Sequence, residues 1–338
     1  MAATIGDVAR AAGVSRSTVS YALTGKRSIS DETRARIQAA IDQLGFTPNA
    51  GARALATSQT NVLGLYLQFE EDEFAPAMLQ YVLPVSAEAR EHGYDLLMVT
   101  DPDVEGAVRR TTSSAMVDGV VLLDVTFDDP RLGPLREATQ PAVLIGYARN
   151  GEGFDSFDLD FGEAARMAVD HLGQLGHRDL ALITPPRHVY ERGGSYAWRF
   201  RDAAIERAAR YGMRITAHYG DSRQPGIEAV LDRTLSDDSR PTALIVHNDA
   251  TLAALPGYLN ARGIGSPRDL SIVGLFSHEF GQSFSLPFTS IETSPDQLGR
   301  QAVAQLMKRL AEGRSAETPR ARFIEPILVD RGSTRSAD

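Results

Sequence analysis

A short predicted helix near the start of the chain carries side chains that can contact nucleic-acid bases. Arg16 and Ser17 stand in its first turn, and Ser20 and Tyr21 stand one turn later on the same outward face. An arginine can donate two hydrogen bonds to a guanine, and a serine hydroxyl can bind a phosphate or a base edge. This spacing is typical of a recognition helix; the alternative is a small helical bundle whose polar face only meets water.

Three predicted helices position these side chains. The first has apolar residues at helical spacing, with Thr4 as its cap and Gly13 at its end. The second follows Ser15 as its N-cap, and the third spans residues 31–44 after Ser30 as its N-cap. Two short helices joined by a tight turn, with a third closing the core, indicate a helix-turn-helix unit.

The segment that follows the third helix is short and rich in small residues. Pro48 and Asn49 favour a helix start, but a helix of this length is too short to be stable alone. The segment carries one large apolar side chain, Leu55, close to the basic Arg53. We predict either a flexible linker or a hinge that becomes helical on DNA and inserts Leu55 between base steps in the minor groove.

The charge of the chain is divided unevenly. Residues 1–60 hold seven basic and four acidic side chains, a net charge of +3; the whole chain of 338 residues carries −9, so the remaining 278 residues carry −12. A basic head on an acidic body predicts that only the head binds nucleic acid. The sequence has no apolar run that could cross a membrane and no secretory segment at its start, which predicts a cytoplasmic protein without a membrane partner.

Motifs for catalysis, metals or cofactors are not found in the sequence. The chain has no cysteine, which excludes disulfides and thiolate ligands. It has no motif of a serine hydrolase, a zinc protease, a P-loop or a dinucleotide-binding fold. His171 and His177 are six residues apart, a spacing that fits no common metal site, and we predict structural histidines. We therefore expect no enzyme, no catalytic residue, no metal and no cofactor.

Beyond residue 61 the sequence alternates apolar strands with helices, which predicts parallel sheets. One helix is predicted over residues 78–92. Trp198, between Tyr196 and Phe200, is predicted to lie in the core stripe of a helix, with ligand stacking as the alternative. The predicted strands span residues 62–68, 94–100, 119–123, 142–145, 180–184, 214–219, 243–246 and 271–275.

Many residues of the first fifty stand at fixed spacings: TIGDVARAAGVS at 4–15, STVS at 17–20, LTGK at 23–26, IS at 29–30, TR at 33–34, LGF at 44–46 and PN at 48–49. These motifs resemble the lactose/galactose repressor (LacI/GalR) family of transcription regulators. A looser match continues through the body at 171–172, 175–178, 241–243, 248–249 and 269–274. The resemblance implies an all-α helix-turn-helix headpiece with a hinge helix, followed by an α/β body of two doubly wound subdomains. Such a body is similar to a periplasmic binding protein, with a ligand cleft at the strand ends.

The same resemblance implies a ligand-responsive DNA-binding transcription regulator, most often a repressor. Such a protein binds a near-palindromic operator on double-stranded DNA as a homodimer. Tyr21 stands where most relatives have an arginine. The alternative is a sugar-binding module without DNA binding, which the basic residues of the head disfavour. The candidate DNA-binding residues are Thr4, Ser15, Arg16, Ser17, Thr18, Ser20, Tyr21, Lys26, Arg27, Asn49, Arg53 and Leu55.

Some effector positions carry over from the family. Asn248 matches the residue that hydrogen-bonds the effector, and Asp249 is expected to cap the following helix. Phe74 falls where relatives often place an aromatic ring against the ligand, and Arg192 is the basic residue nearest to a family arginine position. The candidate effector-binding residues are Phe74, Tyr147, Arg192, Trp198, Asn248 and Phe276.

Other positions depart from the family. Phe276, Ser277, Gly194 and Gly146 stand where relatives have charged residues that hold a sugar. These departures predict a pocket that is less charged and more aromatic, in which simple hexoses bind poorly because their hydroxyls lack partners. We expect a glycoside or an oligosaccharide as the effector, with a planar ring such as a nucleobase as the alternative.

The expected organisation has four parts and a tail. They are a headpiece at 1–48, a hinge at 49–60, a first effector subdomain at 61–155 plus 290–318, a second at 156–289 plus 319–332, and a tail at 333–338.

Overall fold

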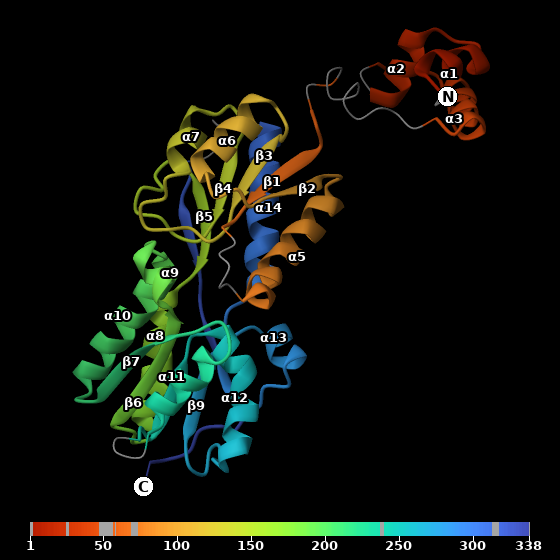
Figure 1. Cartoon of the computed structure of the whole chain (residues 1–338). Coiled ribbons are helices and arrows are strands. Elements are labelled where there is room, and N and C mark those ends of the chain that lie inside the picture. The colour runs from red at the N-terminus through yellow and green to blue at the C-terminus, as the bar shows by residue number, and fades with distance from the viewer. Residues whose placement is uncertain are drawn as a thin grey trace.

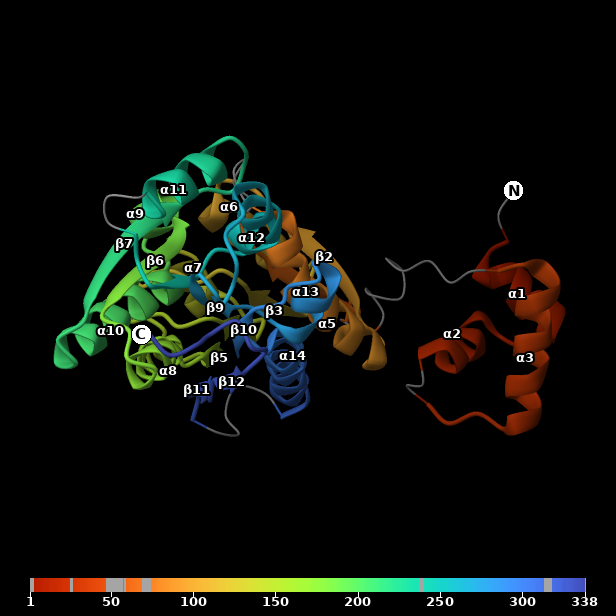
Figure 2. The same ribbon diagram turned by 90° about the horizontal axis from the view of Figure 1, so that it is seen from below.

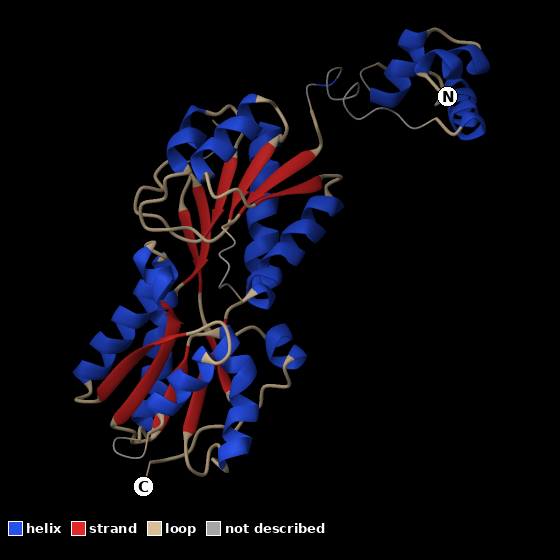
Figure 3. Ribbon diagram, viewed as in Figure 1, coloured by secondary structure: helices blue, strands red, loops and turns tan. Residues whose placement is uncertain are grey.

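The computed structural model describes residues 3–24, 27–46, 57, 59–68, 74–236, 240–312 and 318–337. In these ranges the chain forms a small helical headpiece and a body of two α/β subdomains, each built on its own sheet (Figures 1 and 3). This arrangement confirms the predicted headpiece and two-subdomain body, whereas most of the predicted hinge helix lies outside the described residues. No helix among the described residues is both long and apolar enough to cross a bilayer.

The headpiece consists of α1 (Ile5–Ala12), α2 (Arg16–Thr24) and α3 (Asp31–Leu44). Thr4 caps the start of α1, and Gly13 ends this helix with a left-handed φ of 66°. Val8, Val19 and Ile37, one from each helix, are fully buried and form the core. The three helices and their caps confirm the prediction. The prediction succeeded because the residues that begin and end each helix lie next to it in the sequence.

The first subdomain consists of β1 (Val62–Tyr66), α5 (Ala75–Glu91), β2 (Asp95–Val99), α6 (Val104–Ser113), β3 (Gly119–Leu122), α7 (Leu132–Glu137), β4 (Ala142–Ile145), β5 (Asp155–Leu159), α14 (Pro295–Glu312) and β11 (Ala321–Ile324). Its strands are parallel and pair in the order β11-β5-β4-β3-β1-β2. Helices α5 and α14 lie side by side against one face, and α6 and α7 pack on the other (Figures 1 and 2).

The second subdomain consists of α8 (Phe161–Gln174), β6 (Asp179–Pro186), α9 (Arg187–Glu191), α10 (Ser195–Arg210), β7 (Arg214–Gly220), α11 (Gly226–Thr234), β8 (Ala243–Val246), α12 (Asp249–Arg262), β9 (Ser271–Leu275), α13 (His278–Ser283), β10 (Thr289–Glu292) and β12 (Ile327–Val329). Its strand order is β12-β10-β9-β8-β6-β7, and only the β10–β12 pair among these is antiparallel. Helices α8 and α10 cover one face, and α11 and α12 cover the other.

The chain passes between the subdomains after β5, after β10 and after β11. These crossings lie a few residues beyond the expected boundaries at 155, 289 and 318, so the expected boundaries need correction. The reason is the composition of the boundary strands. Asp155 and Asp158 in β5 are buried polar residues, and the local pattern therefore gave no sign of a core strand.

The expected tail is also corrected, because residues 333–337 are packed on the second subdomain. The hydroxyl of Ser333 donates to the carbonyl of Ile272 at 2.6 Å. The backbone N–H of Ala337 donates to the carbonyl of Leu175 at 2.8 Å. These backbone partners hold an irregular segment that lacks apolar periodicity, which explains why the sequence pattern left it as a tail outside the subdomains.

Candidate functional site

The outward face of α2 carries the side chains predicted to contact bases. Arg16 and Ser17 are exposed, and Ser20 and Tyr21 are partly buried one turn later. The guanidinium of Arg16 lies over Gly6 of α1, where a Cβ atom would be only 2.8 Å from it. The end of the Arg16 side chain can therefore lie across α1 because position 6 has no side chain.

Two predicted residues, Thr4 and Ser15, cap the starts of α1 and α2. The Thr4 hydroxyl donates to the Asp7 carboxylate at 2.7 Å. The Ser15 hydroxyl accepts the backbone N–H of Thr18 at 3.1 Å, which caps α2. Helix starts of this kind present backbone N–H groups that can bind a phosphate.

Arg27, which follows α2, is exposed. The remaining predicted DNA-binding residues, Lys26, Asn49, Arg53 and Leu55, lie outside the described residues.

A cavity of about 170 Å³ lies between the two subdomains of the body. Leu123 after β3, Ile145 in β4, His247 after β8 and Leu275 in β9 all line it, at or next to the carboxyl ends of parallel strands. Doubly wound folds bind ligands at this edge of the sheet. The cavity is therefore where the fold predicts a small-molecule site.

Three of the six candidate effector-binding residues line this cavity: Phe74, Arg192 and Asn248. Asn248, rather than Asp249, is the N-cap of α12, because its Oδ1 accepts the backbone N–H of Thr251 at 2.7 Å. The expected role of Asp249 as the cap is thus corrected, and its carboxylate lies in the first turn and faces the cavity.

Phe276 does not line the cavity, which corrects the expectation for this residue. Its side chain is 1% exposed in the core of the second subdomain, where Gly274 and Gly281 leave room for the ring. Leu275 lines the cavity instead. Successive side chains of an extended chain point to opposite sides, so the two neighbours cannot both face the ligand site.

Tyr147 and Trp198 are likewise absent from the cavity lining. The Tyr147 ring packs on Phe323, with 5.7 Å between ring centroids. The indole N–H of Trp198 donates to the carbonyl of Tyr190 at 3.1 Å, and the two rings meet edge to face. Both aromatic side chains therefore stabilise packing between neighbouring elements.

Sequence reasoning missed the acidic residues of the cavity. Asp124, Asp158 and Asp249 line it, together with the aromatic rings of Phe161 and Tyr196. The expectation of a less charged pocket is therefore corrected. Each of these aspartates stands in or just after a predicted or observed strand, and that position was the available signal.

Burial controls the protonation of several cavity groups. It raises the pKa of Asp249 to about 6, against hydrogen bonds from its own backbone and from Gln80. It raises the pKa of Asp158 to about 6 as well, although the Arg199 guanidinium opposes the shift. It lowers the pKa of His247 to about 3, so this imidazole is neutral at pH 7.

The raised pKa of Asp249 predicts a pH-dependent stability. Between about pH 4 and 6 the folded protein binds more protons at Asp249 than the unfolded chain does, so this contribution to the free energy of unfolding falls as the pH rises. Asp249→Asn is expected to remove this contribution. The free energy of unfolding of the variant, relative to that of the wild type, should therefore rise by roughly 1 to 3 kcal/mol between about pH 4.5 and pH 7. Urea denaturation at both pH values measures this difference.

The matched control is Asp128→Asn, at a surface side chain that is 68% exposed and lies outside the cavity. It should keep the pH dependence of the wild type. If Asp249→Asn also keeps the pH dependence of the wild type, the Asp249 carboxylate is ionised from about pH 4.5 to pH 7.

The two parts of the chain each match a known sequence family. Residues 4–49 match the bacterial regulatory proteins of the lacI family, and residues 169–334 match a periplasmic binding protein-like domain. Together the two matches cover more than half of the chain.

Relatives that match over the whole chain agree with these two family matches. The ribose operon repressor of Escherichia coli (strain K12) is 29% identical over 98% of this chain and 99% of its own, and the HTH-type transcriptional repressor PurR of Glaesserella parasuis serovar 5 (strain SH0165) is 26% identical over 99% of each. The fold is similar to the lac repressor dimer bound to operator and the anti-inducer ONPF, with a TM-score of 0.82, 24% identity and coverage of 99% and 100%. A transcriptional regulator CelR–cellobiose complex gives a TM-score of 0.67 at 25% identity, covering 98% and 99%.

A helix-turn-helix headpiece joined to a two-subdomain body with a ligand cavity defines a ligand-responsive DNA-binding transcription regulator. The chain belongs to the LacI/GalR family, as its headpiece motifs predicted.

Proposed function

We propose that this protein is a homodimeric repressor that binds a palindromic operator and responds to a carbohydrate in the cavity. The observation that carries the proposal is the position of the cavity, which is lined by residues of both subdomains. A ligand that binds one arrangement of the subdomains more tightly shifts the population toward it. Coupled to the segment at 49–60, such a shift changes operator affinity.

The chemistry of the cavity favours a hydroxyl-rich ligand. Asp124, Asp158 and Asp249 offer carboxylate oxygens that accept hydrogen bonds from sugar hydroxyls. Phe74 and Tyr196 offer ring faces for the C–H face of a sugar. The names of two relatives point to carbohydrates as well, since they refer to ribose and to cellobiose. Our proposal is a glycoside or an oligosaccharide; a free hexose fits as well, because these carboxylates supply partners for its hydroxyls.

The dimer is proposed to form through the outer face of α5 and β2. Leu79 and Leu83 are 48% and 64% exposed one helical turn apart on α5, and Met98 of the neighbouring β2 is 54% exposed. A cluster of exposed large apolar side chains on a monomer marks a surface for association. We also propose a cytoplasmic location, because a transcription regulator acts where the chromosome is.

Selection of bound sequences from random DNA tests the proposal. A palindrome is the expected result for a homodimer with one headpiece per half-site. Calorimetry with hexoses, oligosaccharides, aryl glycosides and purines tests the effector, followed by a repeat of operator binding with each ligand that binds. Tight sugar binding without any enriched DNA sequence would instead support a sugar-binding module.

Tyr21 is expected to weaken base specificity at one half-site position. A tyrosine can stack or donate one hydrogen bond, whereas the arginine of most relatives can donate two to a guanine. Tyr21→Arg should therefore add a preference for G at that position, worth roughly 1 to 3 kcal/mol. Repeating the selection with Tyr21→Arg measures this, and an unchanged base preference contradicts the assignment. Tyr211→Arg, an exposed position in the body, is the matched control.

A further inference from the structure

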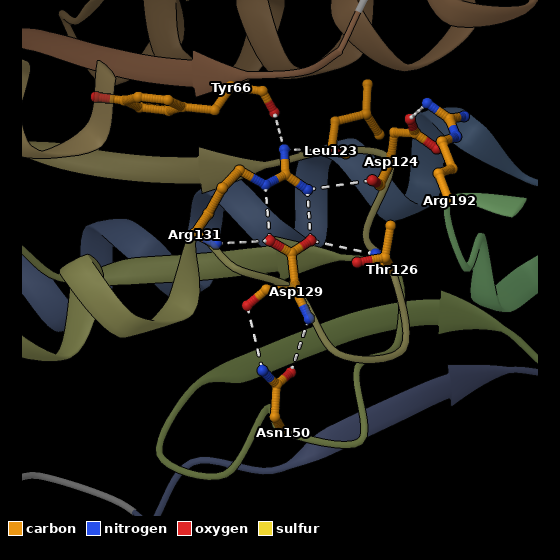
Figure 4. Close-up of polar contacts among 8 residues, drawn as sticks. All are labelled: Tyr66, Leu123, Asp124, Thr126, Asp129, Arg131, Asn150 and Arg192. Carbon is orange, nitrogen blue, oxygen red and sulfur yellow. Dashed lines mark hydrogen bonds and ion pairs between the residues drawn. The ribbon is translucent and has the colours of Figure 1, made fainter. Parts of the chain in front are cut away.

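An ion pair joins the two subdomains across the cavity. Asp124 follows β3 of the first subdomain, and Arg192 follows α9 of the second; Oδ2 of the aspartate and Nη1 of the arginine are 2.6 Å apart. Both residues line the cavity. Figure 4 shows the contact between their side chains. Beside this pair, the backbone N–H of Phe127 donates to the carbonyl of Gly193 at 2.9 Å. The loop after β3 therefore meets the segment after α9 through both a side-chain and a backbone contact.

The buried side chain of Arg131 stabilises the loop after β3. The Arg131 Nε donates to Oδ1 of Asp129 at 2.9 Å, and its Nη2 donates to Oδ2 at 2.7 Å. The same guanidinium donates to the carbonyls of Tyr66, Leu123 and Asp124 at 3.1 to 3.3 Å (Figure 4). Arg131 thus ties the ends of β1 and β3 to the loop through a planar fork of donors.

The loop needs this support because of its backbone. Asp124 has a φ of 56°, a left-handed conformation that a residue with a side chain rarely adopts. Such a conformation persists where the surroundings enforce it. Arg131 and Asp129 are both buried and neither lines the cavity, so their effect on a ligand passes through the residues that Arg131 holds, of which Leu123 and Asp124 line the cavity.

The charged side chains that line the cavity have partners within the protein. The guanidinium of Arg192 is engaged by Asp124, and Asp158 is engaged by Arg199 at 2.6 Å. Asp249 is hydrogen-bonded by the neutral Gln80. A ligand carboxylate would compete with Asp124 for Arg192 and would lie among aspartates. Like charges in a site of low dielectric repel strongly.

We propose that Asp124 sets the charge selectivity of the cavity by occupying Arg192 and so excluding anionic ligands, and that Arg131 is the positioning residue for Asp124. This inference rests on the cavity being the effector site of the proposed function. It narrows the effector to neutral or cationic hydroxylated molecules and excludes sugar acids.

The test compares glucuronate with glucose on the full-length protein at constant ionic strength, by calorimetry. Asp124→Asn keeps the shape of the side chain and tolerates the left-handed backbone, but removes the charge that occupies Arg192. It should bind glucuronate about tenfold more tightly than the wild type does, because a hydrogen bond to a charged group becomes available. Its affinity for glucose should not rise, because a carboxylate that can accept hydrogen bonds from sugar hydroxyls is lost, so the ratio of glucuronate to glucose affinity increases. A variant that binds glucuronate no better than the wild type overturns the proposal.

Arg131→Met should shift the preference toward glucuronate in the same direction, because Asp124 loses its support. The matched control is Arg309→Met. Arg309 is a buried arginine of the same subdomain that pairs with the buried Asp155 at 2.7 Å, and it does not line the cavity. A merely structural role predicts that both variants lose stability alike without any change in ligand preference. Should Arg131→Met fail to fold, Asp124→Asn still decides the charge selectivity.

A second readout needs no ligand. The Phe127 amide bonds across the cleft, so hydrogen exchange should show it protected in the wild type and less protected in Asp124→Asn, with the core strands unchanged. An unprotected Phe127 amide in the wild type contradicts the contact between the subdomains. Failure of every carbohydrate to bind the wild type, with this exchange pattern intact, would refute the proposed effector class and leave the contact standing.

Discussion

Leu83→Asp is expected to convert the dimer to a monomer and to weaken operator binding by about 10²- to 10⁴-fold. Leu83 is 64% exposed and is the most exposed of the three large apolar side chains, Leu79, Leu83 and Met98, on the face of α5 and β2. A carboxylate buried there on association would lose its hydration without a partner, which opposes dimer formation. A monomer then binds one half-site and loses the effective concentration that links the two headpieces.

Analytical ultracentrifugation gives the oligomeric state, and titration of labelled operator gives the affinity. Ile205→Asp is the matched control, since Ile205 is 42% exposed on α10 of the second subdomain, away from the proposed interface. It should remain a dimer and bind operator like the wild type. If Leu83→Asp is still a dimer, the interface lies on another face of the body.

The headpiece shows what a sequence can predict. Its third helix begins and ends at the predicted residues 31 and 44, because Ser30 and Gly45 mark both ends locally. The strands at 142–145 and 243–246 also match, since each is a continuous apolar run. In these cases every necessary signal lies within a few residues of the element.

The strands at the subdomain crossings show what a local pattern cannot contain. Asp155 is buried at the start of β5, and it is stabilised by Arg309 from α14 and Arg322 from β11 at 2.8 Å each. These partners are more than 150 residues away along the chain. A buried carboxylate is stable only with such partners, so a strand that carries it looks polar until the tertiary contacts are known.

The sequence predicted the position of the cavity in the fold, but only some of the residues that line it. Its position follows from the edge of parallel sheets, which topology alone defines. Its lining depends on which side chains meet when two subdomains approach. Phe276 was carried over by position and lies in the core, whereas Asp124 from the loop after β3 and Asp158 from β5 line the cavity together. Register within a strand decides such cases, and one residue of difference turns a side chain to the other face.

Leu55→Ala is expected to weaken operator binding by roughly 30- to 1000-fold, the equivalent of a few kcal/mol, and to abolish DNA bending. An apolar wedge in the minor groove unstacks a base step, and the bent duplex then contacts more of the protein. Alanine is too short to act as a wedge, so both the bend and the added contacts are lost. Electrophoretic mobility of operator fragments with permuted site positions measures the bend.

Two further measurements separate this role from general damage to the headpiece. The salt dependence of binding should persist in Leu55→Ala, because the phosphate contacts of the headpiece remain, and effector affinity should be unchanged. Leu44→Ala is the matched control, since Leu44 is a partly exposed leucine at the end of α3 outside the candidate DNA-binding set. It should bend operator like the wild type. If Leu55→Ala bends and binds operator like Leu44→Ala, residues 49–60 act as a flexible linker and not as a hinge that inserts into DNA.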